Sequence, residues 1–128
     1  MSLRKNKFTQ EDKLFMNLAL NLARDRLGLT GENPSVGCVI VKNNTIISTG
    51  QTGLNGRPHA EYNAIKSCKK KLNGSKMYVS LEPCAHYGKT PPCTNIIINS
   101  KIKEVIFSIE DIDLRTKFKS IKILKKKK

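Results

Sequence analysis

Four side chains in this sequence have the types and spacing of a catalytic metal site. His59 is followed two positions later by Glu61, and Cys84 and Cys93 come further along the chain. One imidazole and two thiolates form a three-ligand set for zinc, which leaves the fourth corner of the tetrahedron open to a water whose pKa the metal lowers to ~7. A structural zinc has four protein ligands instead. We therefore expect His59, Cys84 and Cys93 to hold a catalytic Zn²⁺.

The residues around these ligands indicate the reaction. Zinc deaminases of nucleobases share the signature H-x-E…P-C-x-x-C, and here Pro83-Cys84 follows it, but eight residues rather than two separate the cysteines. Glu61, at a predicted helix start, can reach a metal-bound water, and such a proton-moving group typically contributes ~10²–10⁴ in rate. The pattern predicts hydrolytic deamination of a heterocycle with Glu61 as the catalytic group. His86 is a competing ligand, although a loop or substrate contact is the favoured interpretation.

Each of these residues alone has an ordinary structural explanation, such as a capping histidine, a first-turn acid or a buried thiol. Their occurrence together and in order favours zinc. The other two cysteines, Cys38 in an apolar run and Cys68 in a helical pattern, are expected to be inert.

The first predicted element is an amphipathic helix. Residues 9–12 form a capping-box pattern, and apolar side chains recur at helical spacing up to Gly28. We expect one buried face made of Leu14, Leu18 and Leu22 with Phe15, Ala19 and Ala23.

The segments that carry His59 and Cys84 follow a predicted antiparallel hairpin, with strands over 36–42 and 45–49 and a turn at Asn43-Asn44. A loop over 50–58 leads to a helix over 60–71 that ends at Asn73-Gly74, with Lys69, Lys70 and Lys71 near its C-terminal end, where cations suit the helix dipole. Its inner face is expected to comprise Ala60, Ala64, Ile65 and Cys68.

Pro83 is expected to open a turn that places Cys84 at a helix N-terminus, where the dipole favours the thiolate. The remaining predicted elements are strands over 76–81 and 105–109, a short helix over 94–100 with an apolar patch at 96–98, and a strand or helix over 119–124. Strands that alternate with helices after a hairpin predict an α/β fold, a three-layer α/β/α sandwich around a central mixed five-stranded sheet.

The length of 128 residues fits one domain, for which we expect a zinc-dependent deaminase domain over 1–124 and a basic tail over 125–128. The formal charge of +14 suggests an anionic partner, but residues 115–128 hold eight of the 24 bases and no acid. With no Trp and few other aromatic residues for base stacking, nucleic acid is a disfavoured partner. No apolar run spans a membrane and no secretory signal is evident, so we expect a cytoplasmic protein.

Three stretches resemble the deaminase domain of the riboflavin biosynthesis enzymes, the diaminohydroxyphosphoribosylaminopyrimidine deaminases. They are residues 33–41 (NPSVGCVIV), 56–61 (GRPHAE) and 81–93 (LEPCAHYGKTPPC). The similarity runs from about residue 8 to 124. It implies the cytidine deaminase-like fold, zinc, and conversion of 2,5-diamino-6-(5-phosphoribosylamino)pyrimidin-4(3H)-one to 5-amino-6-(5-phosphoribosylamino)uracil.

The resemblance also implies residue roles. The family's zinc ligands fall on His59, Cys84 and Cys93, and its proton shuttle falls on Glu61. The implied substrate contacts are Asn33 at the base, Lys89 at the phosphate, Asp111 and Asp113 at the ribose, and also Thr52, Ala60 and His86. An amide can hydrogen-bond a pyrimidine edge, and a lysine meets a phosphate as a point charge.

The chain departs from the family pattern in three places. Thr52 stands where some members have a histidine. Around the acidic pair Asp111 and Asp113 the family has prolines and glycines, whereas this chain has Ile112, Leu114, Phe118 and Ser120. No reductase domain follows, so the chain is expected to be a stand-alone deaminase or a fragment, without NADPH, that forms a homo-oligomer or associates with a separate reductase. The alternatives are a zinc deaminase acting on tRNA or another nucleobase or nucleoside, and a nucleic-acid-binding or interaction domain with a structural metal.

Overall fold

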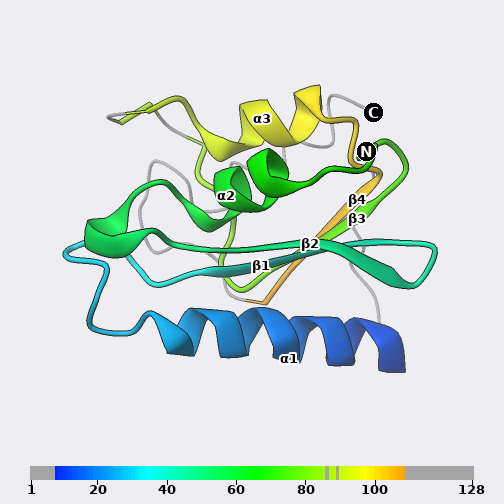
Figure 1. Ribbon diagram of the computed structural model, residues 1–128, viewed down its shortest axis with the longest axis horizontal. Coiled ribbons are helices and arrows are strands. Elements are labelled where there is room, and N and C mark those ends of the chain that lie inside the picture. Colours follow the sequence, from blue (N-terminus) through cyan, green and yellow to red (C-terminus); the bar gives the residue numbers. More distant parts are fainter. Residues whose placement is uncertain (1–7, 86, 89, 109–128) are drawn as a thin grey trace.

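The computed structural model describes residues 8–85, 87–88 and 90–108 and contains a mixed four-stranded sheet with helices on both faces (Figure 1). Helix α1 lies against one face of the sheet, and α2 and α3 lie against the other. In chain order the elements are α1 (Gln10–Asp25), β1 (Gly37–Lys42), β2 (Thr45–Gln51), the 3₁₀ turn η1 (Leu54–Gly56), α2 (Ala60–Ser67), β3 (Lys76–Val79), α3 (Cys93–Asn99) and β4 (Glu104–Phe107).

The strand order is β2-β1-β3-β4, with β1 antiparallel to both β2 and β3, and β3 parallel to β4. The predicted hairpin is confirmed: Asn43 and Asn44 both have positive φ, as two-residue hairpin turns require. Strand β2 continues to Gln51, two residues beyond the prediction. The parallel pair needs a crossover, and α3 lies within it. The segment over 119–124, predicted to be a strand or a helix, lies outside the described residues, so the fifth strand of the predicted sheet stays a prediction.

Helix α1 begins as predicted, with a capping box between Thr9 and Asp12. Phe15, Ala19 and Ala23 are buried, but Leu14 is 57% exposed, so its predicted place on the buried face is wrong. The apolar residues of α1 form two neighbouring rows along the helix. The sheet covers the row that contains Phe15, whereas Leu14 belongs to the other row. Asp12 is buried as well and accepts a 2.6 Å hydrogen bond from the Tyr78 hydroxyl, which ties the first turn of the helix to β3.

Helix α2 ends four residues earlier than predicted. Cys68 has an extended backbone, and its thiol hydrogen-bonds to the carbonyls of Ile47 and Lys70. The three lysines at 69–71 therefore follow the helix instead of forming its last turn. Asn73-Gly74 is a separate turn, in which Gly74 has positive φ. The helix therefore ends at Ser67, where Cys68 adopts an extended backbone and contacts β2, although the helical pattern of the sequence continues.

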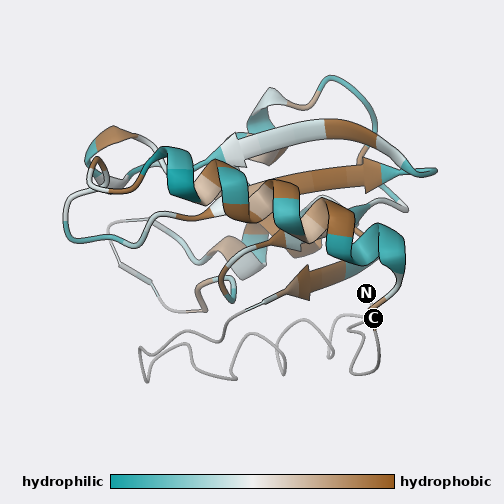
Figure 2. Ribbon diagram, turned by 90° about the horizontal axis from the view of Figure 1, so that it is seen from below, coloured by the Kyte–Doolittle hydropathy of each residue, from teal (hydrophilic) through white to brown (hydrophobic). Residues whose placement is uncertain are grey.

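Two glycines allow the helices to approach the sheet closely. A side chain at Gly37 would clash with the backbone of α1 at Ala19, and one at Gly50 would clash with α2 at Ala60 and Ala64. One apolar cluster lies between the sheet and α2 with α3, and a second lies beneath α1. Figure 2 shows α1 in front of the sheet, with hydrophilic and hydrophobic residues alternating along it and largely hydrophobic strands behind it. Cys38 is fully buried in the first cluster, as expected for an inert residue.

No helix within the described parts of the chain is both long enough and apolar enough to cross a bilayer.

Candidate active site

His59 and Glu61 lie at the start of α2, as predicted. His59 is the N-cap residue with an extended backbone, and its side chain makes no capping hydrogen bond, so the imidazole is available for other partners. Glu61 is in the first turn of the helix and only 4% exposed. The close approach at Gly50 brings this end of α2 down onto the sheet.

The two cysteines meet at the start of α3. The described residues 81–85 contain no helix start, so the predicted position of Cys84 at the start of a helix is wrong. Cys93 is the residue that begins α3. The long loop nevertheless folds back, and the backbone N–H of Cys93 donates to Cys84 Sγ at 3.2 Å. Cys84 therefore obtains the helix N-terminal donor that favours a thiolate through a tertiary contact.

The atoms that could bind a metal converge. Nδ1 of His59 lies 3.7 Å from Cys84 Sγ and 3.5 Å from Cys93 Sγ, and the three ligand atoms lie within 4.8 Å of one another. A tetrahedral zinc with Zn–S of about 2.3 Å and Zn–N of about 2.0 Å requires an N···S separation of about 3.5 Å. The three donor atoms and their separations therefore fit Zn²⁺. Thiolate and imidazole groups are also the ligands that suit zinc.

The three side chains shift one another's pKa values. A hydrogen bond with Cys93 lowers the pKa of Cys84 to about 4. The same bond raises the pKa of Cys93, and a hydrogen bond with Cys84 raises the pKa of His59. Cys84 is thus the member of the cluster that most readily becomes a thiolate. Ligation of a metal requires deprotonated cysteines and a neutral histidine, so binding releases any protons that these side chains carry.

Glu61 is close to this cluster but is not one of its ligand-forming members. Burial raises the pKa of Glu61 to about 7, and the nearby Cys84 thiolate adds to the increase. A carboxyl group in this environment exchanges protons near neutral pH.

Three of the residues predicted to contact a substrate lie within the described part of the chain. The Asn33 amide nitrogen donates to the Gly56 carbonyl at 2.9 Å, which leaves its oxygen for a ligand. The buried Thr52 hydroxyl accepts from the Val36 N–H and donates to the Pro34 carbonyl. Ala60 is fully buried. The other four, His86, Lys89, Asp111 and Asp113, lie outside the described residues, as do Ile112, Leu114, Phe118 and Ser120.

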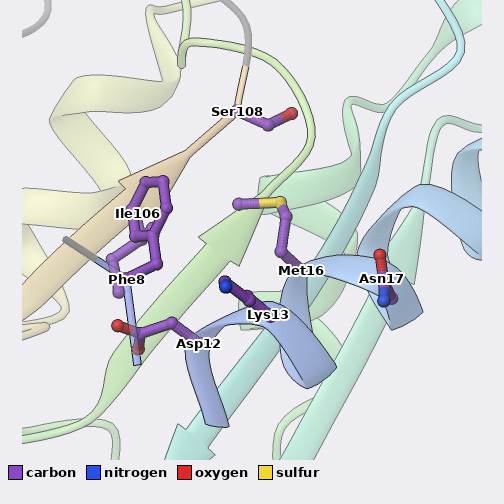
Figure 3. A pocket seen from close by; sticks show the side chains of 7 residues that line it. All are labelled: Phe8, Asp12, Lys13, Met16, Asn17, Ile106 and Ser108. Carbon is purple, nitrogen blue, oxygen red and sulfur yellow. The ribbon is translucent and has the colours of Figure 1, made fainter. Parts of the chain in front are cut away.

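A pocket of about 130 Å³ opens where α1 begins and β4 ends, lined by Phe8, Asp12, Lys13, Met16, Asn17, Ile106 and Ser108 (Figure 3). None of the metal-binding candidates lines it. Its carboxylate, Asp12, is engaged by Tyr78 and by the Thr9 N–H. We therefore expect the chemistry at the His59 cluster and not in this pocket.

Comparison with known proteins agrees with this geometry. A family model described as the cytidine and deoxycytidylate deaminase zinc-binding region matches residues 9–109. The chain belongs to this deaminase family. It is 43% identical over 117 residues to the diaminohydroxyphosphoribosylamino-pyrimidine deaminase of Buchnera aphidicola subsp. Schizaphis graminum, covering 91% of this chain and 80% of that protein.

Other relatives of this deaminase chain are much longer. It is 48% identical over 100 residues to the riboflavin biosynthesis protein RibD of Aquifex aeolicus, covering 78% of this chain but only 28% of that protein. The crystal structure of the Thermotoga maritima deaminase/reductase superposes with a TM-score of 0.85 at 38% identity, over 91% of this chain and 34% of that one. A cyanophage dCMP deaminase shares the fold, with a TM-score of 0.72 at 20% identity, over 94% of both chains.

One cation in the segment before His59, Arg57, was not among the residues predicted from the sequence. The Arg57 side chain hydrogen-bonds Thr90, in the loop between the two cysteines. Its position two residues before His59 was the available signal, but a contact across 33 residues of sequence cannot be read from local spacing.

Proposed function

We propose that this protein is a zinc-dependent hydrolase that deaminates 2,5-diamino-6-(5-phosphoribosylamino)pyrimidin-4(3H)-one to 5-amino-6-(5-phosphoribosylamino)uracil in riboflavin biosynthesis. The observation that carries the proposal is the convergence of His59, Cys84 and Cys93 beside a buried, non-ligating Glu61. The similarity to the Buchnera deaminase, over four fifths of that protein, supports the choice of substrate.

In the proposed mechanism His59, Cys84 and Cys93 hold the metal. Zn²⁺ bound there would act as a Lewis acid and would lower the pKa of a water to ~7. Glu61 takes a proton from the attacking water and passes it to the ring nitrogen. It then takes the remaining proton from the newly bound hydroxyl, which becomes the product carbonyl, and delivers it to the departing amine. The carbon–oxygen bond forms, the exocyclic carbon–nitrogen bond breaks, and ammonia leaves. The burial of Glu61 supports this role, because bulk water then competes less for its proton.

The proposed substrate contacts extend from the same cluster. Asn33 has a free amide oxygen next to the turn that precedes His59, which supports a contact with the pyrimidine edge. We assign Ala60 a contact through its backbone, because its side chain is buried, and we assign Thr52 to the wall of the site. The remaining proposed contacts are His86 in the cysteine loop, Lys89 at the phosphate, and Asp111 and Asp113 at the ribose.

The wider organisation follows from the same proposal. We propose a deaminase domain over 1–124 that completes a five-stranded sheet and a three-layer α/β/α sandwich, followed by the basic tail at 125–128. A cytoplasmic location, and self-association or association with a separate reductase, complete the proposal. The reductase named in the Thermotoga maritima structure supports such a partner.

Ammonia release by the zinc-loaded protein tests the function. We expect turnover of the diaminopyrimidine phosphoribosyl substrate and none of cytidine or of a tRNA anticodon stem-loop. Turnover of the stem-loop, with none of the diaminopyrimidine, would overturn the proposal in favour of a nucleic-acid deaminase.

A further inference from the structure

Arg57 connects the two loops that carry the metal-binding side chains. It lies two residues before His59, and its Nη1 donates a 3.0 Å hydrogen bond to the Thr90 hydroxyl, in the loop between Cys84 and Cys93. Its Nη2 lies 3.7 Å from the position that a side-chain carbon at Gly88 would occupy. The guanidinium is thus held against the outer part of the cysteine loop.

Arg57 is tied to the metal-binding cluster by position. It lies two residues before His59, and its hydrogen-bond partner Thr90 lies three residues before Cys93. The guanidinium therefore lies between the segment that carries His59 and the loop that ends at Cys93.

The charge of Arg57 has no anionic partner among the residues that the structure describes. No carboxylate within the described residues forms an ion pair with Arg57, and its side-chain hydrogen bond goes to a neutral hydroxyl. The side chain is half-buried, so its charge is only partly hydrated. A guanidinium has five N–H donors in a planar fork that matches the oxygens of a phosphate, and one of these donors is used by Thr90.

We propose that Arg57 binds the phosphate group of the substrate and so contributes to the preference for a phosphorylated ligand. The assignment of this anion to the substrate rests on the proposed function. The hydrogen bond to Thr90 orients the fork, and the remaining donors bind the phosphate oxygens. This contact selects the ligand and takes no part in proton transfer, so it affects binding of phosphorylated ligands alone.

The test compares Arg57→Gln with a matched control, Arg26→Gln. Arg26 is also half-buried and also hydrogen-bonds a neutral side chain, Gln51, but it is the C-cap residue of α1. For Arg57→Gln we expect kcat/KM for the phosphorylated substrate to fall about 10- to 100-fold, the range for one charge-assisted hydrogen bond. Its kcat/KM for the dephosphorylated ribosyl compound should change by less than about 3-fold, as should both values for the control.

A second variant separates binding from loop positioning. Thr90→Val removes the hydrogen bond but keeps the charge of Arg57, so discrimination between the two compounds should persist and zinc content should be unchanged. If Arg57→Gln loses zinc, or lowers kcat/KM equally for both compounds, the residue only ties the loops together and the proposal is overturned.

Binding of ribose 5-phosphate, followed by NMR titration of the protein, gives a result that does not depend on turnover. Wild type and Arg26→Gln should bind it, and Arg57→Gln should bind at least about 10-fold more weakly. That outcome supports the phosphate contact even if the diaminopyrimidine proves not to be the substrate. Equal binding by all three proteins would refute it.

Discussion

Replacement of Thr52 by valine should destabilise the protein, whereas the same replacement at Thr94 should stabilise it. Both threonines are buried, with exposed fractions of 1% and 0%. The Thr52 hydroxyl accepts a 2.8 Å hydrogen bond from the Val36 N–H and donates to the Pro34 carbonyl. The Thr94 hydroxyl has no hydrogen-bond partner within the described structure. Valine has nearly the same shape as threonine, so the two variants isolate the hydroxyl.

The magnitudes follow from these partners. Thr52→Val leaves the Val36 N–H buried without an acceptor, because Val36 is only 7% exposed, and such an orphaned group costs about 1–3 kcal/mol. Thr94→Val removes an unsatisfied buried hydroxyl and should recover about 1 kcal/mol of its desolvation penalty. The two variants should therefore differ by roughly 3 kcal/mol in the free energy of unfolding.

Urea unfolding of both variants and wild type, at one saturating zinc concentration, measures this difference. A change in midpoint without a change in the slope m reports stability alone. The same sign of change at both positions would refute the reasoning. A loss of stability at Thr94 would show that its hydroxyl has a partner in the folded protein.

Three further predictions concern the cluster and its surroundings. Glu61→Gln should retain zinc and lose at least ~10² in turnover, and loss of zinc from this variant would assign the glutamate a structural role. Cys84→Ser should lose metal and some stability, since site assembly is coupled to folding, and unchanged zinc content would contradict the ligand assignment. Burial raises the pKa of the Cys38 thiol, so iodoacetamide at pH 8 should label Cys38 only after the protein unfolds. The half-buried Cys68 should react before Cys38. Labelling of Cys38 in the folded protein, detected by mass spectrometry, would contradict its burial.

Local order in this protein was predictable from the sequence. The capping box at Thr9 and the Asn43-Asn44 turn depend on residues within a few positions of each other, and both were predicted correctly. The metal-binding side chains were recognisable because zinc needs particular donor types, and the family resemblance rests on the three sequence stretches over 33–41, 56–61 and 81–93. Such features depend on short-range geometry and on the chemistry of single side chains.

Only the tertiary structure decided where these elements end and which distant groups meet. Helix α2 stops at Ser67 because Cys68 contacts β2, although the sequence continues a helical pattern. The Cys84 thiolate obtains its N–H donor from Cys93, and the link from Arg57 to Thr90 joins segments 33 residues apart. The sequence by itself determined the donors, the local turns and the family. Their assembly into a site depended on long-range packing, because the free energy of those contacts exists only once the sheet and helices have come together.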